Sequence, residues 1–185
     1  ALANARDDDA HPAFSKLFVH TEFLPDRGAV IATRRRRSPS DQEIWAGHLL
    51  YIEKGGLGVT AAETDRAKFL GRGNSVRTPG QLAPDAGPTG TTGYVLDPIF
   101  SLSHKVRVPG QGRVRVYLWT FAADSREEVI RLIDRHRSVG AFTRVAMLGW
   151  TQSQVQLRHL GIGADEAGRY QKLAGYVTFP HPALR

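Results

Sequence analysis

The order of apolar and polar positions divides the chain into a strand-rich part and a helical part. In the stretch 15–23, Leu17, Val19, Thr21 and Phe23 fall on alternate positions. A period of two predicts a β-strand with one buried face. Similar patterns predict further extended segments at 29–34, 43–53, 59–65, 94–108 and 113–123. A sheet-forming part therefore occupies the first two-thirds of the sequence.

Glycine and proline mark the turns between these segments. Pro25 and Gly28 predict a tight turn that folds the second segment back on the first as a hairpin. The stretches KGGLG at 54–58 and PGQG at 109–112 are also predicted to be hairpin turns. The range 71–92 is rich in Gly, Pro, Thr and Asn and predicts a long irregular loop, a feature that is uncommon and often functional.

The hydrophobic period changes to that of a helix at Ser125. The sequence SREE forms a capping box, with Ser125 as N-cap and Glu128 as the third helical residue, and Gly140 is expected to close this helix. Two more helices are predicted, at 141–160 and 164–178. Because strands precede helices and do not alternate with them, the pattern favours a mainly β fold, an antiparallel sheet or sandwich with C-terminal helices.

Composition and charge narrow the chemistry. The 185 residues include no cysteine, which excludes disulfides and thiolate metal sites, and the seven histidines form no HxxxH or HExxH pair. No apolar run reaches the ~20 residues of a membrane span. The formal charge of +7 favours anionic partners. The densest cluster, Arg34–Arg37, has no DNA-reading motif or aromatic platform beside it, so we expect a solvated strand end or a domain contact and no nucleic acid.

The segment ETDRAKFLGRG, residues 63–73, is the main candidate for chemistry. It could be a phosphate cradle, half of a sugar-cleaving site or a polar loop at a strand end. Its glycines fit no dinucleotide or P-loop motif. Glu63 and Asp65 would share a strand face about 7 Å apart, comparable to the carboxylate separations of glycosidases. Surface salt bridges to Arg66 or Lys68 explain the same residues.

Other candidates point to structure more than to chemistry. The large aromatic side chains of Trp45, Trp119 and Trp150 are expected mostly to fill a core, since stacking on sugar rings is the less common use. No nucleophile, base and orienting residue form a recognisable triad. Local patterns alone therefore describe a β-rich domain with a helical appendage.

Four long stretches occur in the order found in one known family. They resemble the phosphorylase-like part of cyclic β-1,2-glucan synthases and, more distantly, the N-terminal domain of cellobiose and chitobiose phosphorylases. The likeness covers residues 11–185. The stretches are HPAFSKLFVHTEFLPDRGAVIATRR, ETDRAKFLGRGNSVRTP, VLDPIFSLSHKVRV and WTQSQVQLRHLGI.

The resemblance implies a fold and a division of the chain. The fold is an antiparallel β-sandwich of the super-sandwich, galactose-mutarotase-like type, followed by two or three linker helices. These helices would lead to an (α/α)6 barrel that the chain lacks. We expect a linker at 1–12, the sandwich at 13–124 and the helical linker at 125–185.

The resemblance also implies a non-catalytic role in an enzyme that acts on β-1,2-glucan. In an inverting phosphorylase one carboxylic acid protonates the leaving oxygen and phosphate attacks by itself. In the family that acid lies on the barrel. We therefore expect this fragment to be inactive alone and to need no cofactor, with phosphate as a co-substrate of a complete glycosyltransferase or glucan phosphorylase.

The resemblance places segment 63–73 at a loop directed towards the sugar cleft. Arg72 is the best candidate to bind a sugar hydroxyl or phosphate, because a guanidinium donates two hydrogen bonds at once. Asp65 would orient Arg66 or Arg72, and Gly71 and Gly73 flank that arginine. A purely structural role for these residues is the alternative.

Partners and location follow from the same likeness. We expect β-1,2-glucan to bind through the complete enzyme, contact with the barrel, and a homodimer. The parent is expected in the bacterial inner membrane, with this domain soluble on its cytoplasmic side. The alternatives are a stand-alone carbohydrate-binding module and a basic interaction module that uses Arg34–Arg37.

Overall fold

The computed structural model describes residue 10 and the ranges 16–36 and 38–179. The chain divides into two compact units, residues 1–139 and residues 140–185. The predicted linker at 1–12 lies outside the described residues, apart from residue 10.

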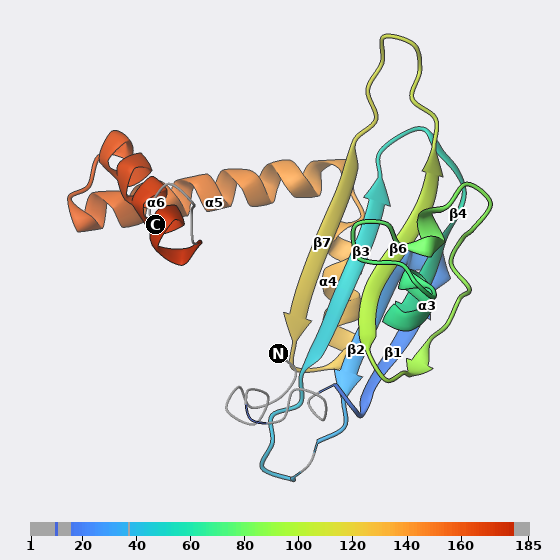
Figure 1. Ribbon diagram of the computed structural model, residues 1–185. Helices are drawn as coiled ribbons and strands as arrows, with labels where there is room; N and C mark the ends of the chain where they lie inside the picture. Colours follow the sequence, from blue (N-terminus) through green and yellow to red (C-terminus); the bar gives the residue numbers. More distant parts are fainter. Residues whose placement is uncertain (1–9, 11–15, 37, 180–185) are drawn as a thin grey trace. The chain divides into compact units, whose positions relative to one another are not determined.

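The first unit is an antiparallel β structure with one long helix (Figure 1). Every strand pairing in the described residues is antiparallel, which confirms the predicted fold class. Its strands are β1 (Val19–Leu24), β2 (Ala29–Arg34), β3 (Trp45–Ile52), β4 (Gly56–Asp65), β5 (Gly93–Tyr94), β6 (Pro98–Val106) and β7 (Val116–Ala123). Its helical segments are η1 (Pro25–Arg27), α3 (Arg66–Leu70), η2 (Gly80–Leu82) and α4 (Arg126–His136).

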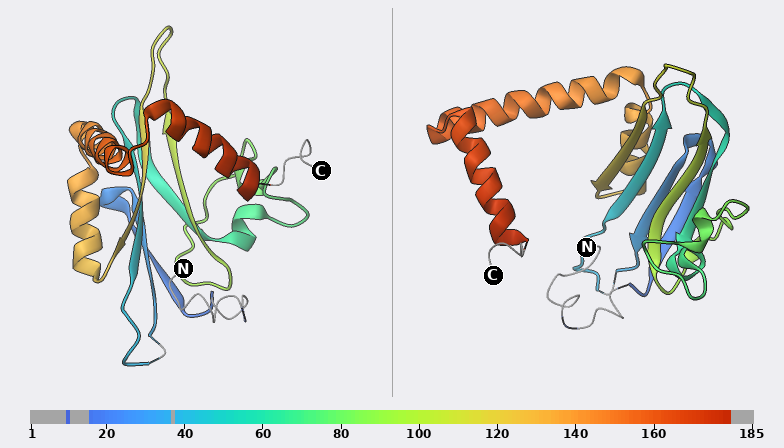
Figure 2. Two further views of the ribbon diagram at one scale, coloured as in Figure 1. Left: turned by 90° about the vertical axis from the view of Figure 1, so that its left-hand side faces the viewer. Right: turned by 45° about the horizontal axis from the view of Figure 1, so that its top comes forward.

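The strands form two sheets. The main sheet has the order β5-β1-β2-β3-β7, and β4 and β6 form a separate two-stranded ribbon. The ribbon covers one face of the main sheet and α4 covers the other (Figure 2). Val30 of β2 pairs with His48, whose ring stacks on Phe100 of the ribbon with centroids 5.8 Å apart. The middle strand β2 is therefore buried on both faces.

The hairpin predicted for the first two segments is present. β1 and β2 pair along their full lengths across η1. Gly28, which follows η1, has a φ of 62°, a conformation that only glycine adopts without strain. A Cβ there would lie 3.1 Å from the Thr60 hydroxyl and 3.2 Å from the carbonyl of Leu50, so the close approach of neighbouring strands also requires glycine.

The two other predicted hairpins are wrong, although both turns exist. The turn after β3 leads to β4 in the ribbon, and the turn at 109–112 leads from β6 in the ribbon to β7 in the main sheet. β3 pairs instead with β7, and β4 with β6. Each turn therefore carries the chain from one sheet to the other. Local turn chemistry predicts the reversal but not the partner strand.

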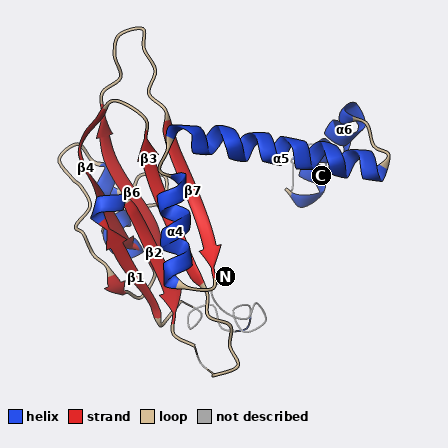
Figure 3. Cartoon of the chain, turned by 180° about the vertical axis from the view of Figure 1, so that it is seen from behind, coloured by secondary structure: helices blue, strands red, loops and turns tan. Residues whose placement is uncertain are grey.

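The main hydrophobic core lies between α4 and the main sheet (Figure 3). Val129 and Ile133 of α4 are fully buried against Ala29, Ile31 and Leu49 of the sheet. Trp45 and Trp119 pack against this cluster, as predicted, whereas Trp150 in the second unit is 67% exposed. The exposed position of Trp150 differs from the expected core position.

The predicted N-terminus of α4 is confirmed and its predicted end is wrong. The Ser125 hydroxyl accepts a hydrogen bond from the Glu128 N–H at 3.2 Å. The helix ends at His136, and Gly140 lies inside the next helix instead of closing this one. Because α4 packs on the core of the first unit, that unit extends to residue 139.

The arginine cluster is only partly solvated. Arg34 is 6% exposed as the last residue of β2, while Arg35 and Arg36 are exposed. Arg37 lies outside the described residues. Of the two expectations for this cluster, a solvated strand end fits Arg35 and Arg36 but not Arg34, and a contact with another domain stays a prediction.

The second unit contains two helices, α5 (Val139–Leu160) and α6 (Ala164–Thr178). They match the helices predicted at 141–160 and 164–178 closely. Gly161 separates them with a φ of 68°. Among the described residues, none of the helices combines the length and apolar character needed to cross a bilayer.

Candidate functional site

Segment 63–73 is the end of β4 followed by a short helix and a turn. Asp65 caps α3: its side chain accepts a hydrogen bond from the Ala67 N–H at 2.9 Å. Gly71 closes α3 with a φ of 73°, and its N–H donates to the Ala67 carbonyl at 2.9 Å. The local sequence rules of helix capping explain this geometry.

Glu63 is fully buried at the end of β4. Its Oε1 accepts from the Asp65 N–H at 2.9 Å, and its Oε2 accepts from the Thr89 N–H at 3.2 Å and the Thr89 hydroxyl at 2.5 Å. Burial acts to raise the pKa of Glu63, but the hydrogen bonds from Thr89, Asp65 and Thr91 together lower it. The carboxylate is therefore held in its charged form.

The predicted carboxylate pair is not arranged for acid–base chemistry. Glu63 has no exposed surface, and the carboxylate of Asp65 is engaged with α3. The strand ladder is also irregular between Glu63 and Asp65, so the regular shared-face spacing expected from an ideal strand does not apply. The structural explanation of this pair is the one that the geometry supports.

Arg66 has a different partner from the one expected. Its Nη1 lies 3.1 Å from Oδ2 of Asp97, whose Oδ1 accepts from Lys16 at 2.9 Å. The Lys16 ammonium, and after it the Arg66 guanidinium, hold the pKa of Asp97 below its usual range although burial opposes them. Asp65 therefore does not orient Arg66. Sequence reasoning does not identify Asp97 as the partner of Arg66, because 31 positions separate the two residues.

Arg72 extends from the turn that follows α3. It is exposed, and among the described residues its guanidinium makes no hydrogen bond or ion pair, with Asp65 or any other residue. Gly73 next to it has a φ of 76° and no atom within 4 Å of an added Cβ. The structure thus brings Asp65, Arg66 and Gly71 together around α3 and leaves Arg72 and Gly73 at the surface.

The loop 71–92 is anchored although it is irregular, as predicted. Pro79 and Gln81 are buried, and a Cβ on Gly80 would lie 3.1 Å from the Leu70 carbonyl at the end of α3. The exposed stretch 72–78 lies between α3 and this buried point. The Arg72 side chain therefore projects from a fixed base.

A separate shallow cavity of about 340 Å³ lies at the opposite end of the ribbon. None of the predicted site residues lines it. Its lining consists of Leu50, Ile52, Glu53, Lys54, Gly56, Gly58, Thr60 and His104. The described residues also contain no group of three or more His, Asp or Glu side chains that could hold a metal ion.

Comparison with known proteins identifies the family of this chain. The family model "Glycosyl hydrolase 94, supersandwich domain" matches residues 1–139. The chain belongs to that family. The match ends where the first compact unit ends, so the glycosyl hydrolase 94 supersandwich domain includes α4 as well as the two sheets.

A curated relative extends the likeness to the helical unit. The cyclic beta-(1,2)-glucan synthase NdvB of Rhizobium meliloti (strain 1021) is 43% identical over 184 residues. This alignment covers 100% of the present chain and 6% of the relative. The supersandwich domain and the helices after it thus correspond to a small part of a much longer protein. Both findings confirm the family resemblance seen in the sequence.

Proposed function

We propose that this chain is the non-catalytic sandwich domain of an enzyme that acts on β-1,2-glucan. The observation that carries the proposal is that both carboxylates of segment 63–73 are engaged structurally: Glu63 is inaccessible and Asp65 caps a helix. The family match and the 43% identity to a small part of a glucan synthase support the choice of glucan. The proton donor for the sugar bond then lies elsewhere in the complete polypeptide.

The contribution of the domain is a supporting wall for the glucan site. Loop 71–92 forms this wall, and Arg72 donates from it to a sugar hydroxyl or to phosphate. An exposed guanidinium with no partner among the residues that the structure describes suits that role, because its planar fork can donate two parallel hydrogen bonds. Gly71 and Gly73 give the backbone beside Arg72 its left-handed turns.

The complete enzyme supplies the remaining parts. In this proposal an (α/α)6 barrel follows the helices and carries the general acid, and phosphate is the co-substrate. The sandwich contributes to a homodimer, and no cofactor binds to this chain. The parent is a membrane protein of the bacterial inner membrane, with this domain on the cytoplasmic side.

The isolated chain tests the non-catalytic role. Purified chain is mixed with β-1,2-gluco-oligosaccharides and phosphate, and release of glucose 1-phosphate is measured. We expect none, while the complete polypeptide supplies the positive control. Release by the isolated chain would show that the catalytic acid lies within these residues.

Arg72 tests the supporting wall in the complete polypeptide. Arg72→Ala is expected to raise KM for the oligosaccharide or phosphate about tenfold or more, the loss of a hydrogen bond from a charged donor. Arg113→Ala is the matched control, because Arg113 is also exposed and lies between β6 and β7. The ends of the ribbon are about 30 Å apart by strand rise, so Arg113 lies far from α3. Equal effects of the two substitutions would contradict the proposal.

One observation favours a second function, a carbohydrate-binding module that acts alone. Tyr94 of edge strand β5 is 68% exposed, and His20 contacts its ring edge-on with centroids 4.9 Å apart. A fixed, exposed ring is suited to stacking on a sugar. Calorimetry of the isolated chain with β-1,2-gluco-oligosaccharides tests this function. Binding that Tyr94→Ala abolishes would support it, and no heat at millimolar sugar would remove it.

A further inference from the structure

The last part of loop 71–92 runs back to the sandwich and into β5. Residues 86–93 are called its returning arm, and alternate residues of this arm form hydrogen bonds with the sandwich. Thr89 donates twice to the buried carboxylate of Glu63. The Thr91 carbonyl accepts from the Thr64 N–H at 3.1 Å and from the Thr64 hydroxyl at 2.9 Å. Two positions further, Gly93 exchanges two 3.0 Å hydrogen bonds with the Thr21 hydroxyl. The arm therefore lies along the strand ends in a defined register.

The same arm also contacts the short helix that precedes Arg72. The Lys68 ammonium donates to the Thr91 hydroxyl at 2.8 Å, and the Thr91 and Thr89 hydroxyls lie 3.0 Å apart. Arg66 holds the chain just beyond the arm through Asp97. Because Arg72 follows the end of α3 by two residues, the position of the arm and the position of Arg72 are linked through α3.

Glu63 is the one charged side chain among the fully buried residues that hold this arm. A buried carboxylate is unfavourable unless donors surround it, and three donors do so here. Two of those donors come from the single residue Thr89, which lies 26 positions away on an otherwise exposed stretch. The neighbouring Gly90 has a φ of 76°, which lets the arm turn beside Thr89. The carboxylate of Glu63 therefore binds the loop at one residue, Thr89.

We propose that Glu63 is a positioning residue: through Thr89 it fixes the returning arm of loop 71–92, and so holds α3 and Arg72 in place for a sugar or phosphate ligand. This inference rests on the proposed function of the loop as a wall of the glucan site. Glu63 itself touches no ligand. Its effect on binding is exerted through the hydrogen bonds to Thr89.

Hydrogen exchange of the intact chain tests the attachment without any ligand. Thr89→Val removes the hydroxyl donor at nearly constant volume, and Thr89→Ser keeps it. Thr33→Val is the matched control, because it removes a 2.9 Å hydroxyl-to-carbonyl hydrogen bond to Ile44 elsewhere in the sandwich. We expect backbone amides of 86–93 to exchange about tenfold faster in Thr89→Val, and unchanged in the other two variants.

A second pair of measurements tests the link to binding in the complete polypeptide. Glu63→Gln and Thr89→Val are expected to raise KM for β-1,2-gluco-oligosaccharide about threefold to tenfold with kcat nearly unchanged, and Thr89→Ser is expected to restore the original KM. If Glu63→Gln fails to fold, the Thr89 variants still decide the question, since they leave the buried carboxylate in place.

The outcomes separate the two proposals. Unchanged exchange in Thr89→Val overturns the attachment. Faster exchange with unchanged KM, while Arg72→Ala raises KM, overturns the positioning role and leaves the wall function standing. No effect on KM from either Arg72→Ala or Thr89→Val overturns both. Faster exchange together with a KM effect that Thr89→Ser reverses supports Glu63 as a positioning residue.

Discussion

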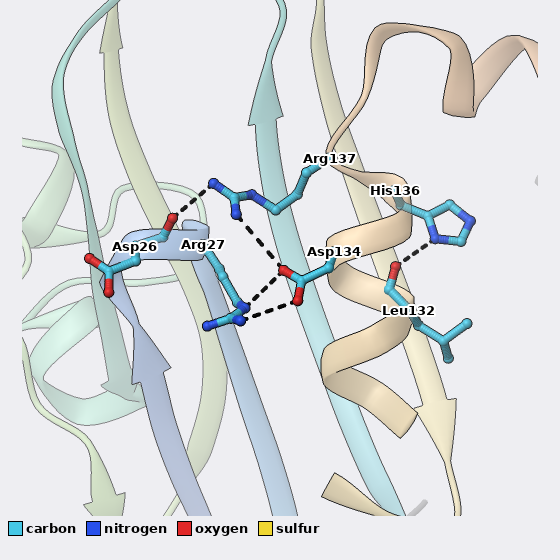
Figure 4. Close-up of polar contacts among 6 residues, drawn as sticks. All are labelled: Asp26, Arg27, Leu132, Asp134, His136 and Arg137. Carbon is cyan, nitrogen blue, oxygen red and sulfur yellow. Dashed lines mark hydrogen bonds and ion pairs between the residues drawn. The ribbon is translucent and has the colours of Figure 1, made fainter. Parts of the chain in front are cut away.

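The guanidinium of Arg27 holds the carboxylate of Asp134 with two hydrogen bonds, although 107 positions separate them in the sequence. Nε lies 2.9 Å from Oδ1 and Nη2 lies 3.1 Å from Oδ2 (Figure 4). Arg137 adds a hydrogen bond to the Asp26 carbonyl at 2.8 Å. These contacts tie the end of α4 to η1, and so fix the helix over the core that it shares with the main sheet.

Asp134→Asn is expected to lower the free energy of unfolding by about 0.5–1 kcal/mol. Both side chains are partly exposed, at 34% for Arg27 and 44% for Asp134, and solvent weakens such pairs. The measurement is urea denaturation, repeated at high salt, where the difference shrinks. Arg131→Ala, which removes the exposed pair with Glu128 on the same helix, is the control and is expected to cost less. A loss above about 2 kcal/mol for Asp134→Asn would contradict the solvent-weakened picture.

Local rules predict the parts of the fold that depend on neighbouring residues. The Ser125 cap, the Gly28 turn and both helices of the second unit follow from capping, from positive φ and from hydrophobic period. The antiparallel β class also follows, because strands precede helices in the sequence. The resemblance then adds the family, which the comparisons confirm.

Non-local pairing is what local rules miss. Nothing near the turn after β3 indicates that β4 leaves the main sheet, since the alternative hairpin satisfies the same turn residues. The partners of Glu63 and Arg66 lie 26 and 31 positions away. A sequence therefore shows that Glu63 and Asp65 are close together, but not that one is buried under a loop and the other caps a helix.

Gly47 of β3 tests the packing of α4 on the main sheet. A Cβ at this position would lie 2.8 Å from Cγ2 of Val129 and 3.4 Å from Cδ1 of Ile133, the two buried residues of α4. Gly47→Ala is therefore expected to lower the free energy of unfolding by about 1–3 kcal/mol through overpacking. Thermal and chemical denaturation measure the change.

The control for Gly47 is a glycine in open space within the same unit. Gly110 has no atom within 4 Å of an added Cβ and lies in the turn between β6 and β7. Gly110→Ala is expected to change stability by less than about 0.5 kcal/mol, as for surface positions in general. Equal effects at Gly47 and Gly110 would show that the helix shifts to accept the methyl group.

His48 is expected to make the fold sensitive to mild acid. It lies between the main sheet and the ribbon, with Nδ1 3.1 Å from the Thr120 hydroxyl, and burial lowers the pKa of its imidazole from 6.5. As pH falls below 6.5, His48 is protonated in the unfolded chain but stays neutral in the folded chain. The free energy of unfolding therefore decreases until pH reaches the lowered pKa.

His48→Gln should remove this pH dependence of the unfolding free energy between pH 7 and 5, measured by denaturation. Thr120→Val should keep it, since burial is the cause, and loss of the slope in Thr120→Val would contradict this.

Glu63 is expected to stabilise the fold near neutral pH and to lose this effect in stronger acid. Its pKa is lowered in the folded state because the donors from Thr89 and Asp65 outweigh burial, so the charged form adds stability above its ordinary pKa of 4.5. That stability is lost as pH falls through the lowered value. The difference in unfolding free energy between the natural chain and Glu63→Gln should therefore be constant near neutral pH and shrink below about 4.5. Lys68→Met is the control, because it removes the hydrogen bond from α3 to the Thr91 hydroxyl and leaves the carboxylate of Glu63 in place. A difference that persists unchanged to the lowest pH at which the chain stays folded would show that the charge of Glu63 is not what holds Thr89.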